Sequence, residues 1–419
     1  LIVGCNSSDP ILYYQQSLVD DGKTGSNVFM LYKDGDIVYN NIINSGALGD
    51  KDITENTIFA IHSMTKTVTT VATMLLHEQG KFNLNDPLEN YLPEYKDIKC
   101  KSSDGIYPCN NKLQIIDLLT HRSGYVYYLP NGENWLTGTH KSLYPNYIST
   151  SKFNNLDDFS KAVAQQPLEF EPGSMYAYGL NQAILGRLIE VLSGMGFYEF
   201  LKENIFDKLG MIDTKFHLTE DDRLRFQPLR VNIKPNSAFN QTDFNLDGYT
   251  AALDGYSYME TNKAHFGGEG LVSTMSDFSK FCEMLVNDGV YGGSRILSSE
   301  SIDIMTSKYT NGYPDPNEPG VFPALAGYYI GFTFSVLENQ EIEGSGAGVG
   351  SYGWSGYHNT HFWIDPEVLN VSRPESNKKT GRLKSSEHLN CQIFHILHFS
   401  VALLLISWCR FSASLPPAS

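Results

Sequence analysis

Ser63 and Lys66 stand three positions apart in the stretch IHSMTKTVTT (residues 61–70), and this pair could carry out nucleophilic catalysis. A serine hydroxyl is a weak nucleophile until a base removes its proton. A nearby lysine can be that base if its surroundings lower the pKa of its amine. The same Ser-x-x-Lys spacing recurs at residues 149–152 and 376–379. Spacing alone therefore does not identify a catalytic pair, and the segments around it must decide.

The segments on either side predict that the pair sits at the start of a buried helix. Residues 58–61 (IFAI) form a short apolar run, and residues 65–80 (TKTVTTVATMLLHEQG) place apolar side chains at helical spacing before a terminal Gly80. In the first turn of a helix, Ser63 Oγ and Lys66 Nζ share one face, and the helix N-terminus favours negative charge. We therefore expect Lys66 to be desolvated, as a catalytic amine requires.

The other elements predict an α/β fold of the α+β type. Residues 27–45 contain two apolar runs around a KDGD turn, which is typical of a strand hairpin, and further strands are expected from residue 325 onward. Helical spacing occurs at residues 11–21, 113–119, 159–164, 182–192, 197–209 and 278–286, and residues 130–150 and 225–262 are long polar loops. We expect both chain ends to build an antiparallel sheet flanked by helices. Residues 10–80 and 265–367 would form this α/β domain, and residues 81–264 would form an inserted helical lobe.

Composition indicates a globular protein that does not bind nucleic acid. The 419 residues are 41% hydrophobic, and a net charge of −16 does not favour binding to phosphate backbones, which needs clustered basic residues. Six cysteines are scattered without a Cys-x-x-Cys pair, so we expect no zinc site, and no other metal or cofactor either. Cys100 and Cys109 lie close together in KCKSSDGIYPC, either as a disulfide of an exported protein or as two free thiols.

The first five residues, LIVGC, are similar to the end of a bacterial lipoprotein signal, in which small residues precede the cysteine that receives a lipid. No methionine starts the chain, which is compatible with a signal whose charged front is absent from this sequence. We interpret residues 1–9 as the remnant of a lipoprotein leader and Cys5 as its lipid attachment site. This predicts an exported protein that is periplasmic or held at the cell envelope by its lipid.

The C-terminal tail, residues 368–419, changes character. Residues 391–409 form a mostly apolar stretch of membrane-spanning length. The basic run KKTGRLK (378–384) precedes it, and in an exported protein those charges would contradict the positive-inside tendency. Over a membrane span we favour the interpretation that the tail lies outside the fold and stems from an altered end of the coding frame.

Beyond the serine and lysine, the chain resembles the serine β-lactamase-like hydrolases, which include class C β-lactamases, D-alanyl-D-alanine carboxypeptidases and the family VIII carboxylesterases. The resemblance runs from about residue 10 to residue 367. Besides SMTK, it is carried by LLHEQGKFNLNDPLENYLPEY (75–95), IIDLLTHRSGY (115–125), EPGSMYAYGLNQAILGRLIEVLSG (171–194), FGGEGLVSTMSDFSKFCEML (266–285) and SYGWSGYHNTHFWIDPE (351–367). It implies a β-lactamase/transpeptidase-like fold and a serine hydrolase that acts through an acyl-enzyme.

The resemblance also implies roles for particular side chains. Ser63 would be the nucleophile, and Lys66 and Tyr178 would act as general bases, because a phenol near a cation has a lowered pKa and can relay a proton to the leaving group. The oxyanion would lie between the backbone N–H groups of Ser63 and Tyr357. Glu269 in GGEGL is expected to be structural.

Two departures from the family pattern shift the expected substrate from lactams and peptides towards esters. Leu180 replaces the asparagine that hydrogen-bonds the substrate's amide side chain in β-lactamases, and family members with leucine there resemble the carboxylesterases. The family's Lys-Thr-Gly motif is matched by Trp354, Ser355 and Gly356, in which an indole replaces a cation that would bind a carboxylate. A literal Lys-Thr-Gly at residues 379–381 lies beyond the resemblance, and we treat it as a coincidence.

Histidines are expected to play lesser parts. His358 follows the third motif closely and is a further candidate for substrate contact. The histidines at 62, 121, 265, 358 and 361 have spacings that match no metal motif. The Ser-Lys-Tyr set also leaves no role for a histidine base, and we expect His121 to brace a loop.

These features predict a serine hydrolase that cleaves carboxylic esters of small or medium acyl groups through a Ser63 acyl-enzyme. An alternative with the same chemistry is a β-lactamase or D-amino-acid peptidase that acts on cell-wall-like amides. An alternative of another class is a catalytically silent scaffold similar to penicillin-binding proteins. The expected binding partner is a small ester or lactam.

Overall fold

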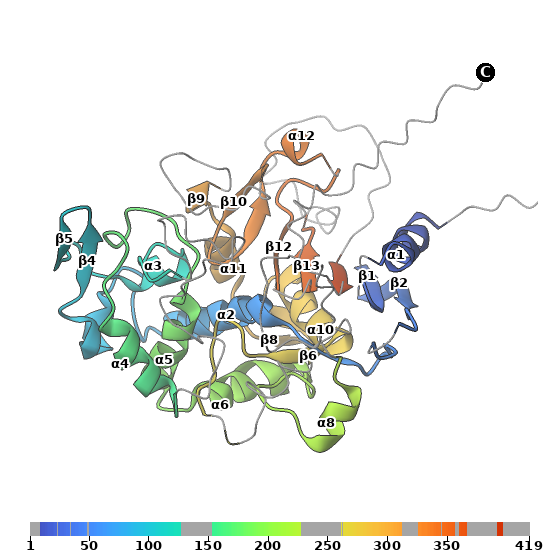
Figure 1. Cartoon of the computed structure of the whole chain (residues 1–419), viewed down its shortest axis with the longest axis horizontal. Coiled ribbons are helices and arrows are strands. Elements are labelled where there is room, and N and C mark those ends of the chain that lie inside the picture. Colours follow the sequence, from blue (N-terminus) through green and yellow to red (C-terminus); the bar gives the residue numbers. More distant parts are fainter. Residues whose placement is uncertain are drawn as a thin grey trace, which may run out of the picture.

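A computed structural model describes residues 9–22, 24–33, 35–47, 50–126, 153–227, 261, 263–311, 326–344, 346–356 and 360–366, together with the backbone of residues 392–396. Strands from both ends of the chain lie on one side of the molecule, and a helical lobe lies on the other (Figure 1). Cys5 and the Lys-Thr-Gly at 379–381 fall outside the described residues, as do most of the two long polar loops. Within the described ranges, no helix is both long and apolar enough to cross a membrane.

One antiparallel sheet of eight strands follows the order β2-β1-β14-β13-β12-β11-β10-β9. Its members are β1 (Asn27–Lys33), β2 (Asp36–Ile43), β9 (Thr310–Asn311), β10 (Tyr328–Ile330), β11 (Ser335–Leu337), β12 (Tyr352–Ser355), β13 (Thr360–Ile364) and β14 (Gln392–Ile396). β1 and β2 form the predicted hairpin, and Gly35 in its turn has a φ of 90°, which glycine adopts without steric cost. The expectation that both chain ends build an antiparallel sheet is confirmed.

Strand β14 corrects the expectation that the whole tail lies outside the fold. Its backbone pairs with β1 on one side and with β13 on the other, with Ile396 opposite both Val28 and Thr360. Without β14, β1 and β13 would each present unpaired backbone groups along an edge. The sequence pattern missed this strand because it is short and is identified by partners that are distant in the chain. Residues 392–396, inside the stretch considered as a membrane span, are therefore part of the sheet.

Helix α2 (Thr65–Glu78) lies between the sheet and the helical lobe (Figure 1). Every residue from Thr65 to Leu76 is buried, although many of them are threonines. Several of their hydroxyls donate to helix carbonyls, as Thr69 Oγ1 does to the Thr65 carbonyl and Thr73 Oγ1 does to the Thr69 carbonyl. These bonds satisfy most of the buried hydroxyls, so a threonine-rich helix can be buried, and Thr70 Oγ1 is the exception in α2.

The helical lobe packs around α5 (Asn181–Ser193), which contacts α2, α3, α4 and α6. The lobe's other helices are α3 (Ile115–Leu119), α4 (Leu156–Ala164), α6 (Phe197–Leu201), the π-helical turn η6 (Lys202–Phe206), α7 (Asp207–Leu209) and α8 (Glu220–Arg225). The helices predicted at 113–119, 159–164, 182–192 and 197–209 thus correspond to α3, α4, α5 and the run from α6 to α7. Each begins within a few residues of its prediction, because amphipathic spacing is a local signal.

Helices also flank the sheet, and short elements complete the fold. α10 (Met275–Val286) packs against β13 and β14, and α1 (Pro10–Asp20) packs against β2. The remaining elements are β3 (Ile58–Ala60), η1 (His62–Met64), η2 (Leu88–Asn90), η3 (Pro93–Tyr95), β4 (Lys99–Ser102), β5 (Gly105–Pro108), β6 (Val272–Thr274), β7 (Val290–Tyr291), β8 (Ser294–Arg295), α11 (Ser299–Thr306) and α12 (Gln340–Glu343). β3 pairs with β6, so the strand that precedes Ser63 is joined to the segment that follows GGEGL.

Candidate active site

Ser63 lies where a strand gives way to the central helix. β3 leads into the 3₁₀ turn η1, and α2 begins at Thr65. Lys66, in the first turn of α2, is 0% exposed, whereas Ser63 is partly accessible. Lys66 Nζ lies 3.1 Å from Ser63 Oγ and 2.5 Å from the carbonyl oxygen of Gly268. The amine and the hydroxyl are thus in direct contact. The lysine is shielded from water, whereas the serine remains partly accessible.

A strained backbone residue makes the sharp turn into Ser63. His62 has a φ of 42°, a left-handed conformation that is uncommon for residues other than glycine and that clusters at functional sites. Hydrogen bonds on both sides hold this turn. Ile61 N–H donates to the carbonyl of Leu271, and Leu271 N–H donates to Thr65 Oγ1. The β3–β6 pair therefore supports the conformation that brings the serine and the lysine together.

The glycine-rich segment after residue 266 packs against α2 beside Lys66. A Cβ on Gly267 would lie 2.4 Å from the carbonyl oxygen of Gln182 and 2.9 Å from Thr69 Oγ1, so a larger residue does not fit there. This close approach places Gly268 O at the lysine and brings Glu269 Oε2 to 3.9 Å from Lys66 Nζ. Sequence analysis missed this carbonyl partner, although consecutive glycines are a signal of close backbone contact.

Tyr178 comes from the helical lobe and reaches the same amine. Its ring centroid lies 4.8 Å from Lys66 Nζ, and its ring packs against Trp354 with centroids 6.0 Å apart. The backbone on its C-terminal side is tightly held. A Cβ on Gly179 would lie 1.8 Å from the carbonyl oxygen of Tyr125, and Leu180 N–H donates to that oxygen at 3.1 Å. The lobe thus places the ring of Tyr178 beside the lysine that α2 carries.

β12 brings the third motif to Tyr178. Trp354, which the sequence comparison within the family pattern matched to a cation, lies against the tyrosine ring. Ser355 is exposed, and its Oγ lies 2.7 Å from His361 Nδ1 on the neighbouring strand. Sequence analysis did not pair these two residues, because their register across β12 and β13 is a property of the sheet.

The turn after β12 packs against the segment that precedes Ser63. A Cβ on Gly356 would lie 2.4 Å from the carbonyl oxygen of Ile61, and Thr360 Oγ1 donates to the same oxygen at 3.4 Å. Gly356 and Thr360 therefore both lie beside the segment that leads into η1. Tyr357 and His358, predicted for the oxyanion hole and for substrate contact, lie outside the described residues.

Leu180, predicted to contact the substrate, is 1% exposed and packs in the apolar core. It occupies the N-cap position of α5 and follows Gly179 directly. In this conformation its side chain has almost no surface to offer a ligand. The leucine instead packs beneath the turn that presents Tyr178.

Three histidines near these segments are held uncharged at neutral pH. Burial and the charge of Lys66 lower the pKa of His62 to about 3, and the same two causes hold the pKa of His121 well below its usual value. Burial lowers the pKa of His361 to about 4. His265 lies elsewhere, with its Nε2 2.8 Å from His217 Nε2.

We expect the protein to lose stability as the pH falls below about 6.5. The unfolded chain protonates a histidine near that pH, whereas folded His62 stays neutral down to about pH 3, so acid favours the unfolded state. At pH 5 this lowers the free energy of unfolding by about 2 kcal/mol for His62. His121 adds a loss of the same sign. Urea unfolding at pH 7 and pH 5 measures the difference.

The variant His62→Asn is the control for this pH dependence, because asparagine tolerates a positive φ and does not titrate. Its stability should differ less between the two pH values than that of the native chain. An identical pH dependence in the two proteins would contradict the assignment.

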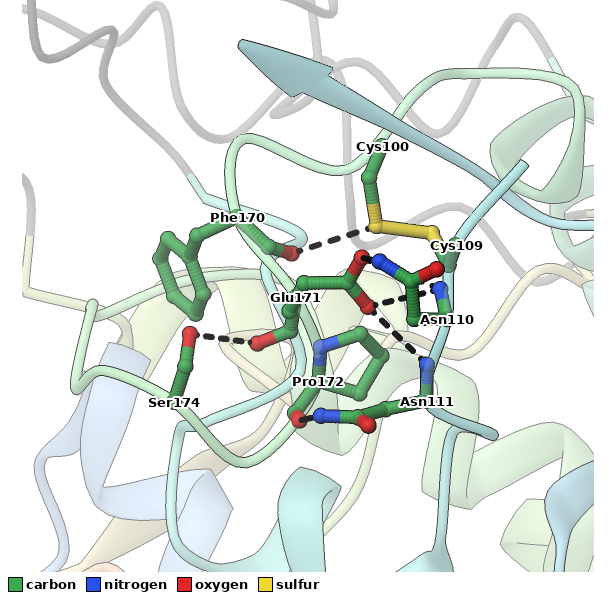
Figure 2. Close-up of a disulfide and its surroundings, with 8 residues drawn as sticks. All are labelled: Cys100, Cys109, Asn110, Asn111, Phe170, Glu171, Pro172 and Ser174. Atoms are coloured by element: carbon green, nitrogen blue, oxygen red, sulfur yellow. Dashed lines mark hydrogen bonds between the residues drawn. A yellow bond between two sulfur atoms is a disulfide. The ribbon is translucent and has the colours of Figure 1, made fainter. Parts of the chain in front are cut away.

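Cys100 and Cys109 form a disulfide, which decides between the two alternatives that the sequence left open. The bridge closes the β4–β5 hairpin, and Cys100 Sγ lies 3.6 Å from the carbonyl oxygen of Phe170 (Figure 2). The N–H groups of Asn110 and Asn111 each donate to the Glu171 carboxylate at 3.0 Å. The bridged hairpin thus anchors the segment that leads to Tyr178. The two sulfurs and Glu171 are spaced like metal ligands, but bonded sulfurs are not thiolate ligands.

Replacing both bridged cysteines with serine is expected to lower the free energy of unfolding by about 2–3 kcal/mol, because the bridge constrains a short loop of the unfolded chain. Urea unfolding with and without dithiothreitol measures the effect. The reductant should destabilise the native chain by the same amount and leave the double variant unchanged. A reductant effect on the double variant would contradict the assignment.

Comparison of the sequence with known proteins places the chain in a family. The chain fits the model of the Beta-lactamase family over residues 15–375. It is 27% identical over 308 residues to the lovastatin esterase of Penicillium rubens, which covers 70% of this chain and 71% of that protein. It is 26% identical over 349 residues to a putative D-alanyl-D-alanine carboxypeptidase of Salmonella typhimurium, over 77% of this chain and 71% of that protein.

Among solved structures, EstCE1, described as a hydrolase with promiscuous acyltransferase activity, has the same fold. It superposes with a TM-score of 0.68 at 19% identity and covers 93% of both chains. With the family match over most of its length, this chain belongs to the beta-lactamase family of serine hydrolases.

Proposed function

We propose that this serine hydrolase is a carboxylesterase that forms an acyl-enzyme on Ser63. The observation that carries the proposal is the convergence of a hydroxyl, a buried amine and a phenol beside an indole. Lys66 Nζ contacts Ser63 Oγ, the Tyr178 ring lies over the same nitrogen, and Trp354 packs on that ring. The esterase named among its relatives supports the same substrate class.

Acylation begins when Ser63 Oγ attacks the ester carbonyl carbon. Lys66 takes the hydroxyl proton across the 3.1 Å contact, while Gly268 O accepts a hydrogen bond from the amine and keeps it oriented. The C–O bond to the alcohol then breaks, and Tyr178 relays the proton to the departing oxygen. The backbone N–H groups of Ser63 and Tyr357 stabilise the oxyanion.

Deacylation repeats these steps with water in place of the alcohol. Water adds to the acyl carbon, its proton passes to the Lys66–Tyr178 pair, and the bond to Ser63 Oγ breaks as the serine regains its proton. The two half-reactions together convert one ester and one water into one acid and one alcohol, and neither step uses a cofactor.

The preference for esters over lactams rests on Trp354. β-Lactams and cell-wall peptides carry a carboxylate, which a cation in the third motif would bind, whereas the indole provides no positive charge. We propose that the exposed Ser355 contacts the ester's alcohol or acyl part, and that His358 does so as well.

A comparison of p-nitrophenyl butyrate with nitrocefin on one preparation tests this function. We expect kcat/KM for the ester to exceed that for the lactam by about 100-fold or more, a difference of about 2.7 kcal/mol. The variant Trp354→Lys restores the missing cation and should reduce this ratio. Faster turnover of nitrocefin than of the ester by the native chain would instead favour the β-lactamase or peptidase alternative, to which the putative carboxypeptidase relative corresponds.

Intact-protein mass measurement after exposure to a fluorophosphonate separates the enzyme from a silent scaffold. A mass increase that is absent in Ser63→Ala is expected. Folded native protein that stays unlabelled would revive the scaffold alternative.

We also propose that the protein is exported and anchored by a lipid on Cys5, as its first residues suggest. When the chain is expressed behind a complete lipoprotein signal in cells that are given a labelled fatty acid, the native protein should carry the label. Label retained by Cys5→Ala would contradict the anchor.

A further inference from the structure

His121 lies behind Tyr178, in the segment that joins α3 to the rest of the helical lobe. Its side chain is 0% exposed, and its backbone has a φ of 56°. Its ring centroid is 4.9 Å from that of Tyr178 and 5.9 Å from that of Tyr176. The imidazole therefore packs directly against the Tyr178 ring.

A chain of hydrogen bonds fixes the orientation and the tautomer of this ring. Tyr125 N–H donates to Ser123 Oγ, and the Ser123 hydroxyl in turn donates to Asn181 Oδ1 at 2.5 Å. The amide nitrogen of Asn181 therefore faces His121 Nδ1, which it approaches to 2.7 Å. Because Nδ1 accepts this bond, the proton of the neutral ring is on Nε2.

Packing alone does not explain why a histidine, with a proton on Nε2, occupies this position. This nitrogen is buried and has no hydrogen-bond partner among the described residues. A buried donor without an acceptor lowers stability, and an apolar ring would fill the same space without that loss. The polar ring gains from its hydrogen bond at Nδ1, which sets the plane that it presents to the Tyr178 ring.

The backbone of His121 holds the same segment. Its carbonyl oxygen accepts the N–H of Ala177, the residue before Tyr178, at 2.8 Å. Residues 121–126 thus hold the tyrosine from both sides, since Tyr125 O accepts the N–H of Leu180. A phenol that must exchange a proton with Lys66 needs such a fixed orientation, because small displacements of a catalytic group lower the rate strongly.

We infer that His121 is a positioning residue for the Tyr178 base, and that Asn181 and Ser123 lock the ring in the orientation that this role requires. The inference rests on the proposed function, in which Tyr178 relays the proton. His121 acts through the tyrosine and transfers no proton itself.

A double-mutant cycle between His121→Asn and Tyr178→Phe tests the inference, with p-nitrophenyl butyrate as substrate. Asparagine tolerates the positive φ and removes the ring. In the native background we expect His121→Asn to lower kcat by about 10–100-fold with KM little changed, because the loss is confined to the transition state. In the Tyr178→Phe background the same substitution should have no further effect.

Two matched variants accompany the cycle. His77→Asn makes the same change at the far end of α2, where the histidine ring contacts Phe82 O, and it should leave kcat unaltered. Ser123→Ala removes only the hydroxyl that holds Asn181, and its smaller loss of kcat should likewise vanish when Tyr178 is phenylalanine. If His121→Asn has no cooperative thermal transition, the Ser123→Ala cycle decides.

Equal losses of kcat in both backgrounds would overturn the inference, because they would show a general structural effect on the site. A change confined to KM, or no change in the native background, would overturn it as well. If Tyr178→Phe retains the native rate, the relay role in the proposed function fails and the positioning role fails with it.

Discussion

Ser63→Ala is expected to lower kcat/KM for p-nitrophenyl butyrate by about 10⁵-fold or more, equivalent to about 7 kcal/mol of transition-state stabilisation. Alanine leaves no oxygen at the position that contacts Lys66 Nζ, so the acyl-enzyme cannot form. The substitution removes one partly accessible atom and should leave the fold intact. Initial rates and intact-protein mass after incubation with the ester measure the two consequences.

The other Ser-x-x-Lys sequences provide matched controls for this result. Ser149→Ala and Ser376→Ala change serines with the same spacing to lysine, and both should keep the native rate. The nucleophile lies elsewhere if Ser63→Ala has the same unfolding temperature as the native chain and still retains more than about 1% of the native rate.

Lys66→Met is expected to lower kcat by about 10³-fold while leaving thermal stability unchanged or raised. The lysine is fully buried, and the removal of a charged group from water costs free energy that a methionine of similar length avoids. Catalysis is lost because no base remains in contact with Ser63. Measured on one preparation, the activity should therefore fall, whereas the unfolding temperature should stay unchanged or rise.

Lys66→Arg separates basicity from charge at the same position. Arginine keeps the positive charge but stays protonated, so it cannot accept the serine proton. We expect it to be as inactive as Lys66→Met. Substantial activity in Lys66→Arg would show that a fixed charge near Ser63 suffices, and would exclude the lysine as general base.

The local elements of this protein could be predicted from the sequence. The β1–β2 hairpin, the buried α2 and most helices of the lobe follow from periodicity and turn residues, because the hydrophobic spacing and turn residues that mark each element lie within its own segment. The serine–lysine contact belongs to the same class, since the two residues are neighbours on one turn. The motifs at Tyr178 and Trp354 were identified by their resemblance to the second and third motifs of the serine β-lactamase-like hydrolases.

Contacts between distant segments could not be predicted in this way. The place of β14 between β1 and β13 depends on pairing with two strands that are far apart along the chain. Periodicity within the tail carries no record of that pairing. The same reason explains why the Ser355–His361 contact was missed, since it arises from the register between two strands.

The sequence by itself determined which chemical groups this protein has and the helices and strands that carry most of them. Only the tertiary structure decided that Leu180 is buried in the core, that Gly268 O orients Lys66, and that the two neighbouring cysteines are bonded. Residue type and spacing express local preferences, whereas burial and hydrogen-bond partners depend on which distant segments approach one another.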